Sequence, residues 1–296
     1  LTGGVLAVDD EVLAGAHPAR TRAVESAGRR GERAEVGARV ALNLAGVEHG
    51  DLRRGDAVVR PGQWVTPSVV DVAVTPVAGV ETKRRRRLHA AVGSGEHRAV
   101  YRPLDDRGQY ARLRLDAALP LAPGDRLVLR DLGRRRTVAG AEVLDVQPAR
   151  KAKDAPARLA RPLGERLLAA SPWLAADELT RAGGLSTAEA EALSDDLVAR
   201  GAATRRDGWL VAPAALDTIR AGALDRVLAH QRSHPGEAGL DLAGVAAGLG
   251  VTPPQLRAAL DGDGELVAER GTVRHRGQVD RAGASSEGRR IVDAFE

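Results

Sequence analysis

The chain has 296 residues, too many for one ordinary domain, and 43% of them are hydrophobic, enough for several cores. The absence of cysteine excludes disulfides and thiolate metal sites, and no signal peptide or apolar run of about eighteen residues occurs, so we expect a soluble cytoplasmic protein without membrane contact. The net charge of +4 is uneven, because residues 81–150 carry 16 basic against 9 acidic side chains, which favours a polyanionic partner for this segment.

Residues 1–76 predict a small β-domain. Short alternating runs are separated there by Gly, Asp and Pro, at the spacing typical of a small barrel or sandwich. The chain begins at Leu1 without a methionine, and both of its ends fall inside patterns that look unfinished. We therefore expect it to be a piece of a longer protein.

Residues 77–147 predict a second β-barrel that ends in a hairpin. Leu127 and Leu129 fall on one face of the first hairpin strand, because side chains alternate between the two faces of a strand. The turn that follows carries three consecutive arginines, Arg134, Arg135 and Arg136. Residues 148–160, rich in Pro, Ala, Lys and Arg, then predict a linker.

Past the linker the hydrophobic period changes from two residues to 3.6, which indicates helices. Ser186 begins a capping box with Glu189, and Asp207–Gly208 predicts a two-residue hairpin turn. The order of three helices and a hairpin then recurs, with Thr252 and Pro253 starting the last helix of the second copy. The sequence thus predicts two winged helices and the start of a truncated third, over residues 161–213, 214–278 and 279–296.

Patterns typical of an enzyme site are absent from the sequence. No glycine-rich loop with the P-loop lysine occurs, and Gly93–Arg98 is expected to be a loop between strands. His89, His97 and Glu96 lack the spacing of metal ligands, so both histidines are expected on the basic surface of the barrel. We therefore expect neither a catalytic residue nor a metal.

The strongest functional signal is a cluster of cations. Arginine makes bidentate phosphate contacts, and the scarcity of aromatic residues disfavours base stacking, so an RNA duplex backbone is the favoured ligand. The alternative is a solvated edge strand that charge protects from aggregation. The candidate backbone-binding residues are Lys83, Arg84, Arg85, Arg86, Arg87, His89, His97, Arg98, Arg134, Arg135 and Arg136.

The predicted winged helices are poor candidates for DNA binding. A helix that enters a groove between phosphates should not be acidic, yet both predicted recognition helices are rich in acids. We therefore expect docking modules or spacers, and a DNA-binding regulator and a protein-docking scaffold remain the alternative functions. The acids of the first of these helices are Glu189, Glu191, Asp195 and Asp196.

One stretch carries a family resemblance. GARVALNLAGVEHGDLRRGDAVVRPG, residues 37–62, resembles the second domain of translational GTPases. Together with RLRLDAALPLAPGDRLVLRDLGRRRTVAGAEVLD, residues 112–145, and the tandem winged helices, it makes nearly the whole chain similar to SelB, the selenocysteine-specific elongation factors of bacteria. The resemblance implies a multi-domain β plus α fold, with two small translation-factor-type β-barrels followed by tandem winged-helix domains.

The resemblance also implies a function. Such factors deliver selenocysteinyl-tRNA to the ribosome at UGA codons with GTP, and their last winged helices bind a hairpin in the mRNA. The family's GTP-binding domain, with its GTP and Mg, and those last winged helices are expected outside this chain, so alone it should be an inactive monomer.

One residue role follows from the resemblance. Arg39, in the family motif G-x-R-[VI]-A-L-N, would face the selenocysteinyl group, where a guanidinium can distinguish an ionised selenolate from a neutral hydroxyl. The second barrel would contact the tRNA backbone, which agrees with the uneven charge of the chain.

Overall fold

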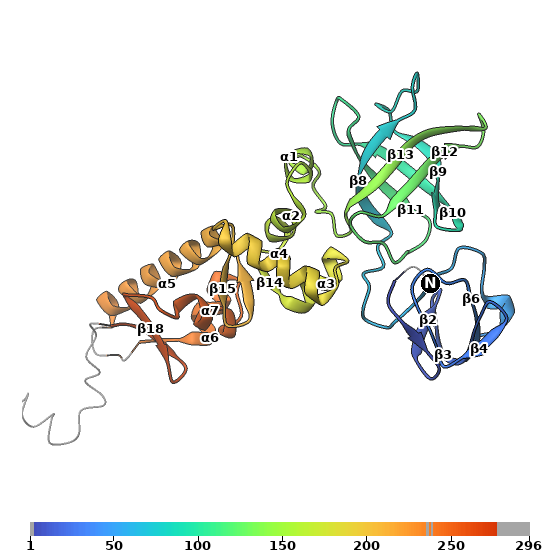
Figure 1. Ribbon diagram of the computed structural model, residues 1–296. Coiled ribbons are helices and arrows are strands. Elements are labelled where there is room, and N and C mark those ends of the chain that lie inside the picture. The colour runs from blue at the N-terminus through green and yellow to red at the C-terminus, as the bar shows by residue number, and fades with distance from the viewer. Residues whose placement is uncertain (1–2, 235–236, 238, 277–296) are drawn as a thin grey trace, which may run out of the picture. The chain divides into compact units, whose positions relative to one another are not determined.

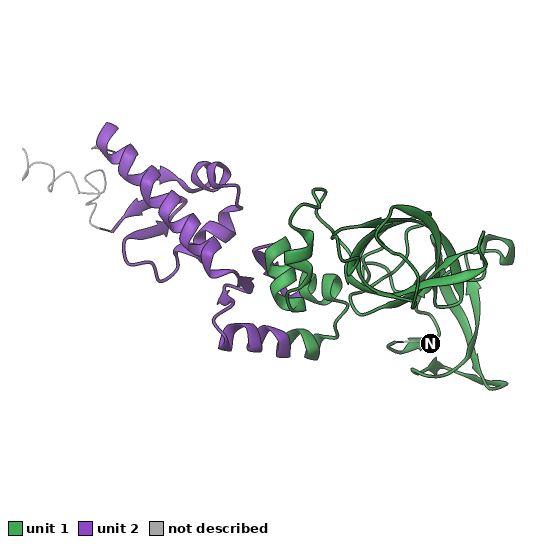
Figure 2. Cartoon of the chain, turned by 90° about the horizontal axis from the view of Figure 1, so that it is seen from above, with its two compact units in different colours: residues 1–170, 177–191 green, residues 171–176, 192–296 purple. Residues whose placement is uncertain are grey.

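The computed structural model of the chain describes residues 3–234, 237 and 239–276 (Figure 1). By their internal contacts they form two compact units, each described here by itself (Figure 2). The first contains Leu1–Ala170 and Asp177–Glu191, and the second Ser171–Ala176 and Ala192–Glu296. Within the part of the chain that is described, no helix is both long and apolar enough to cross a membrane. The segment predicted to start a third winged helix, 279–296, lies outside the described residues.

The N-terminal β-region consists of a five-stranded and a two-stranded antiparallel sheet. The sequence predicts a barrel or sandwich here. The hydrogen bonds between the described strands instead form a sheet in the order β4-β3-β2-β7, with β6 also paired to β3. The strands are β1 (Leu6–Ala7), β2 (Glu11–Ala14), β3 (His17–Ser26), β4 (Arg29–Gly31), β5 (Arg33–Ala34), β6 (Val40–Ala45) and β7 (Val58–Val59), with a short 3₁₀ turn η1 (His49–Asp51).

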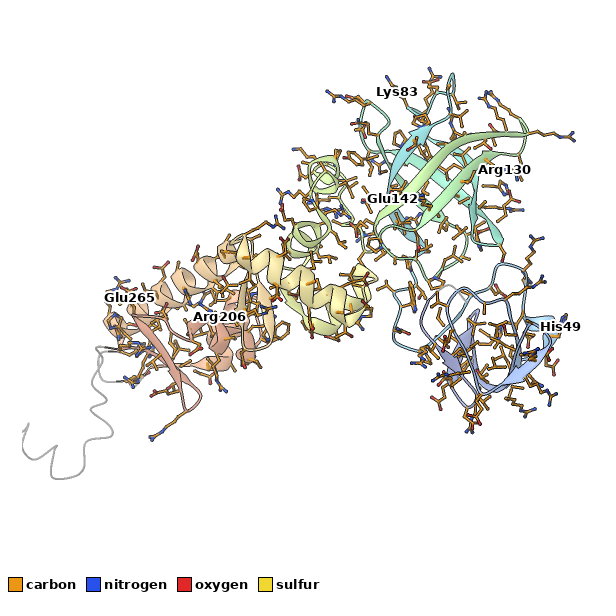
Figure 3. The ribbon with its side chains drawn as sticks, viewed as in Figure 1. His49, Lys83, Arg130, Glu142, Arg206 and Glu265 are labelled. Atoms are coloured by element: carbon orange, nitrogen blue, oxygen red, sulfur yellow. The ribbon has the colours of Figure 1, made fainter. Side chains whose placement is uncertain are left out.

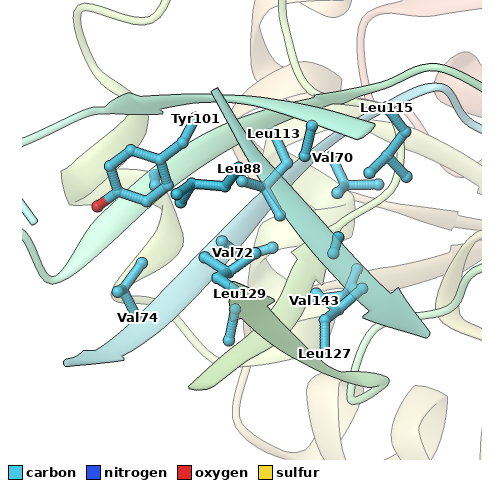
Figure 4. Close-up of a cluster of buried hydrophobic side chains, with 14 of the residues drawn as sticks. Val70, Val72, Val74, Leu88, Tyr101, Leu113, Leu115, Leu127, Leu129 and Val143 are labelled. Atoms are coloured by element: carbon cyan, nitrogen blue, oxygen red, sulfur yellow. The ribbon is translucent and has the colours of Figure 1, made fainter. Parts of the chain in front are cut away.

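The next six strands close into an antiparallel barrel in the order β10-β11-β8-β13-β12-β9. Val70, Val72 and Val74 of β8 fill its interior with other buried side chains (Figure 4). Leu127 and Leu129 are buried and Val128 is 43% exposed, which confirms the predicted alternation. The strands are β8 (Val69–Pro76), β9 (Arg86–Val92), β10 (Gly95–Pro103), β11 (Tyr110–Leu115), β12 (Arg126–Asp131) and β13 (Arg136–Asp145).

The remaining described chain is mainly helical, as its hydrophobic period predicts. Each of two short hairpins, β15–β16 and β18–β19, packs in a three-stranded sheet with one further strand. The elements are α1 (Ala155–Leu159), α2 (Leu163–Ala170), β14 (Trp173–Ala175), α3 (Ala176–Gly183), α4 (Thr187–Ala199), β15 (Thr204–Arg206), β16 (Trp209–Val211), α5 (Pro213–Ser233), β17 (Leu240–Asp241), α6 (Leu242–Leu249), α7 (Pro253–Leu260), β18 (Leu266–Glu269) and β19 (Thr272–His275).

The local signals predicted for the helical part are present. The backbone N–H of Ser186 donates to the Glu189 carboxylate at 2.8 Å, and that of Glu189 to the Ser186 Oγ at 3.3 Å, which is the predicted capping box. Asp207 and Gly208 both have positive φ, at 43° and 81°, as a type I′ turn requires. Thr252 caps α7 as predicted.

The segment predicted as a linker, residues 148–160, contains helix α1. Ala155 and Leu159 of this short helix are buried, so the segment is not a free tether. A segment rich in Pro, Ala, Lys and Arg can form either an extended linker or a short helix that packs against a domain. Composition alone therefore did not predict the helix.

Two glycines let the N-terminal β-region approach the barrel closely. Gly55 has φ +104°, and a Cβ built on it would lie 2.5 Å from the Cα of Gly95, where β10 begins. Atoms never approach so closely without a shift of backbone, so only glycine fits at this position.

We predict that Gly55→Ala destabilises the protein by about 1–3 kcal/mol more than Gly62→Ala does. Both glycines have positive φ, but a Cβ on Gly62 meets no atom within 4 Å, so the difference isolates the contact with Gly95. Urea unfolding of both variants, followed by tryptophan fluorescence, measures it. Equal losses of unfolding free energy in the two variants would show that the contact between Gly55 and Gly95 does not contribute to stability.

Candidate nucleic-acid interface

A row of cations crosses three neighbouring strands of the barrel. Arg130 of β12 lies opposite His89 of β9, and His89 lies opposite Arg98 of β10. Their chain neighbours Leu129, Leu88 and Ala99 are buried, so the three side chains lie on the outer face. We call Arg130, His89 and Arg98 the cationic row, in which adjacent strands are about 4.8 Å apart.

More arginines extend this row along the strands. Arg87 of β9 and Arg114 of β11 both lie opposite Val100, which is two residues from Arg98 on β10. Two residues along a strand correspond to about 6.8 Å, so five cations share a small area of the barrel. Arg102 lies a further two residues along β10. All four arginine side chains at these outer positions, Arg87, Arg98, Arg102 and Arg114, are exposed.

The two arginine-rich segments lie at the same end of the barrel. Strand β12 runs antiparallel to β9 with Arg130 opposite His89, so the turn after Asp131 lies at the end where β9 begins, with Arg86. The loop that leads into β9 starts beside the same hairpin, because the N–H of Val77 donates to the Val138 carbonyl at 3.0 Å. Lys83 and Arg130 both lie on the outside of the barrel (Figure 3). The structure thus brings together the predicted Lys83–Arg87 and Arg134–Arg136.

Several of these cations form weak ion pairs with acidic neighbours. Arg84 lies 3.4 Å from the Glu81 carboxylate, and the side chains of both are more than half exposed. Arg134 lies 3.9 Å from Asp131, and Arg130 lies 3.9 Å from Glu96. Exposed pairs contribute about 0–1 kcal/mol each, so a phosphate can replace the carboxylate at little cost.

A buried tyrosine holds the base of the basic loop. The hydroxyl of Tyr101, a residue of the barrel core, donates to the backbone carbonyl of Thr82 at 2.8 Å. Thr82 is also buried, and a Cβ on Gly108 would lie 2.7 Å from its Oγ1, so the loop packs tightly there. Burial raises the pKa of Tyr101 above its usual value. Lys83 therefore follows a fixed backbone.

One predicted surface residue is placed differently. The side chain of His97 is only 16% exposed, and its Nδ1 lies 3.7 Å from the Asp116 carboxylate. Its Nε2 is fully buried, 2.8 Å from the position of a Cβ on Gly95. His97 was expected on the open basic surface, and this is wrong, because alternation along β10 places it on the same face as the buried Ala99 and Tyr101. His89 does lie in the cationic row.

Two arginines of the interface were not predicted. Alternation placed Arg130 on the outer face of its strand, and Arg114 shares that pattern in β11, but alternation does not say which strands are neighbours. Both join the other cations only through the pairing of β12 with β9 and of β10 with β11.

The closed barrel argues against the edge-strand explanation of the charges. Strand β9 pairs with β10 and β12, and β12 pairs with β13 and β9. Each of these strands has two neighbours, so their cations have no edge to protect.

The other candidate residues lie elsewhere. Arg39 is exposed just before β6 in the N-terminal β-region, and its carbonyl accepts a hydrogen bond from the Ser26 hydroxyl at 3.3 Å. No group of three or more His, Asp or Glu side chains suited to a metal ion occurs among the residues that the structure describes.

The helices at the recognition positions offer little to a DNA groove. In α4, Asp195 pairs with Arg205 at 2.7 Å and Asp196 with Arg200 at 2.8 Å. Arg200 and Arg205 are therefore neutralised by acids of α4, and the helix has no excess of positive charge.

The second predicted recognition helix, α7, was expected to be acidic, and this is wrong, because it ends at Leu260 and the acids Asp261, Asp263 and Glu265 follow it. Arg257 is its single charged residue, and most of its apolar side chains are buried.

Comparisons with known proteins relate the barrel to one family. A family model of the β-barrel domain of selenocysteine-specific elongation factors matches residues 70–150, the region of the closed barrel. The chain is 30% identical over 198 residues to the selenocysteine-specific elongation factor of Desulfomicrobium baculatum, covering 62% of this chain and 30% of that relative. It is 34% identical over 161 residues to that of Escherichia coli (strain K12), covering 53% and 25% respectively.

A solved structure shares the fold. The crystal structure of the bacterial selenocysteine-specific elongation factor EF-Sec aligns with a TM-score of 0.73 at 18% identity, over 92% of this chain and 45% of that one. The multi-domain β plus α fold class is confirmed, and so is the resemblance to selenocysteine-specific elongation factors. The chain matches less than a third of the length of these curated relatives.

The buried tyrosine yields a prediction about pH. Because the folded pKa of Tyr101 is raised above 10.0, its contribution to stability is fully present below pH 10 and is lost as the pH rises through the folded value. Tyr101→Phe cannot ionise, and it lacks a hydrogen bond that contributes about 1 kcal/mol. The variant should therefore be less stable at pH 8, and the difference from the unmodified protein should shrink above pH 10.

Urea unfolding of both proteins from pH 8 to above pH 10 measures this difference. A stability gap that does not change with pH would contradict the assignment of the buried hydroxyl.

Proposed function

We propose that this chain supplies tRNA and aminoacyl contacts of a selenocysteine-specific translation elongation factor. The observation that carries the proposal is the concentration of cations on one side of a closed barrel whose sequence matches the β-barrel domain of that family. The whole factor would deliver selenocysteinyl-tRNA to the ribosome at UGA codons with GTP. An mRNA hairpin would bind winged helices beyond those of this chain.

The chemistry of the barrel face suits an RNA backbone. Arginine presents a planar fork of donors that matches the phosphate geometry, and such contacts contribute affinity without reading sequence. The single Phe, two Tyr and three Trp of the whole chain leave little aromatic surface for stacking single-stranded bases. The double-helical arms of a tRNA are therefore the favoured ligand of this face.

Arg39 is proposed as the aminoacyl-recognition residue. It is exposed on the N-terminal β-region, so its guanidinium can reach a bound group. A selenol is ionised at neutral pH while a serine hydroxyl is not, so the cation would stabilise the selenocysteinyl ester alone. The two tasks would then be divided, with backbone affinity on the barrel and discrimination on the N-terminal β-region.

The rival functions have less support. A DNA-binding regulator would need a basic recognition helix, whereas α4 carries four acids, two of which, Asp195 and Asp196, are paired with arginines. A pure scaffold would bind no nucleic acid, and the cationic row would then have no role.

The first prediction of this proposal concerns salt dependence. Replacing Arg134, Arg135 and Arg136 by alanine should reduce the slope of log K against log salt concentration by about 0.7–0.9 for each phosphate that the arginines neutralise. All tRNAs should be weakened alike, because backbone contacts carry no sequence information. Fluorescence titration of labelled tRNAs from low to physiological salt measures the slope.

The matched control removes equal charge from the N-terminal β-region. Arg29, Arg30 and Arg33 lie on β4 and β5, and their replacement by alanine should leave the slope nearly unchanged. Equal slopes for the unmodified protein and the hairpin variant would remove the hairpin from the interface.

The second prediction concerns discrimination. In a chimera that places the GTP-binding domain of a relative before this chain, Arg39→Ala should lose the preference for selenocysteinyl-tRNA over seryl-tRNA. The expected loss is about 10- to 100-fold, from a charge-assisted hydrogen bond of about 1.5–3 kcal/mol. The salt slope should stay the same, because the barrel is intact.

Arg39→Lys is the informative control, since it keeps the charge and removes the planar fork. It should retain part of the preference. If Arg39→Ala kept the full preference in competition binding, the aminoacyl role of this residue would be wrong.

A further inference from the structure

The half of the barrel opposite the cationic row carries a buried ionic cluster. Arg112 of β11 lies opposite Asp71 of β8, and Asp71 lies opposite Asp145 of β13. Val70 and Val72 on either side of Asp71 fill the barrel interior, so Asp71 points outward. Asp71 is nevertheless 0% exposed. Another element must therefore cover the outside of these strands.

Helix α1 provides that cover through one arginine. Arg158 donates from Nη2 to Asp71 at 3.4 Å, and its Nη1 bonds to the Asp145 carboxylate. Arg112 binds the same Asp71 with two parallel bonds, at 2.7 Å from Nε and 3.0 Å from Nη2. The side chain of Arg158 is 15% exposed. A single side chain thus links α1 to two barrel strands.

Opposite charges meet in the hydrogen-bonded part of the cluster, and a third arginine, Arg166, also interacts with Asp145 and Arg158. Two arginines face two carboxylates, so each charge has a partner of opposite sign. Burial raises the pKa of Asp71, and its hydrogen bonds to Arg112 act in the opposite direction. Removing one member of a buried ion cluster leaves an uncompensated charge, which is strongly destabilising. Loss of any one of these four side chains is therefore expected to destabilise the whole cluster.

The ring order separates this cluster from the cationic row. Strands β11, β8 and β13 are consecutive in the barrel, and the cationic row occupies the other three, β12, β9 and β10. In the first half Asp71 is covered by residues of the same chain, whereas Arg87, Arg98 and Arg130 in the second are exposed. The apolar core of the barrel lies between them.

We propose that residues 150–162 form a strap that Arg158 locks onto the barrel, so that α1 moves with the barrel as one body. Besides Arg158, the strap is held by its buried Ala155 and Leu159 and by a hydrogen bond of 3.4 Å from Arg112 to the Arg150 carbonyl. The strap covers Asp71, which is 0% exposed.

Hydrogen exchange on the full chain tests the strap. Arg158→Gln should raise amide exchange within residues 155–159 by roughly tenfold or more, because the lock no longer opposes local opening. Trypsin should also cut faster after Lys151 and Lys153. Peptides from β9 and β10 should keep the protection of the unmodified protein. Unchanged exchange in 155–159 would overturn the proposal.

Two further variants make the test decisive. Arg150→Gln removes an exposed arginine of the same segment and should leave exchange unchanged. If Arg158→Gln alone fails to fold, Asp145→Asn with Arg158→Gln removes one charge of each sign and leaves Asp71 paired with Arg112. This double variant should keep a protected barrel and release the strap, and a strap still protected in it would overturn the proposal. Neither outcome depends on RNA, so the result is independent of the proposed function.

Discussion

Closure of the six-stranded barrel is the constraint on which the other features depend. Once β9 pairs with both β10 and β12, every strand has two neighbours and the interior is sealed by Val, Leu and Ala side chains. Charged residues on these strands can then only lie outside. The ring order decides which of them meet, and it places the cationic row and the Asp71 cluster on different halves. The cationic row and the contact with α1 therefore lie on different strands, while the N-terminal β-region approaches β10 at Gly95.

The two halves use the same residue types in opposite ways. Arg130 and Arg84 are exposed beside Glu96 and Glu81, and pairs of this kind are weak enough for a phosphate to displace the carboxylate. Arg112 is nearly buried and bonded twice to Asp71, where no water can take the place of either partner. Solvent exposure, more than residue identity, separates a cation that is available to an external anion from one that holds the protein together.

The helical part is consistent with support and docking, not with reading of DNA. Its two hairpins end in the same kind of tight turn, at Asp207–Gly208 and Arg270–Gly271, which agrees with the repeat seen in the sequence. Trp173 and Trp209 pack edge to face at 6.0 Å between ring centroids, a contact that stabilises the first hairpin's sheet. Helix α4 carries four acids, and the nearby Arg200 and Arg205 are paired with two of them, so the barrel is the surface of the described chain that best suits a polyanion.

Local patterns in the sequence were sufficient for the strands, turns and caps. The alternation at Leu127 and Leu129, the Ser186 capping box and the run Lys83–Arg87 depend on residues close in the chain. The partners of Arg130 and Arg114, the burial of His97 and the covering of Asp71 by Arg158 were decided only by the tertiary structure. The physical reason is that a period of two residues determines which face a side chain takes, whereas strand register and barrel closure join residues far apart in sequence.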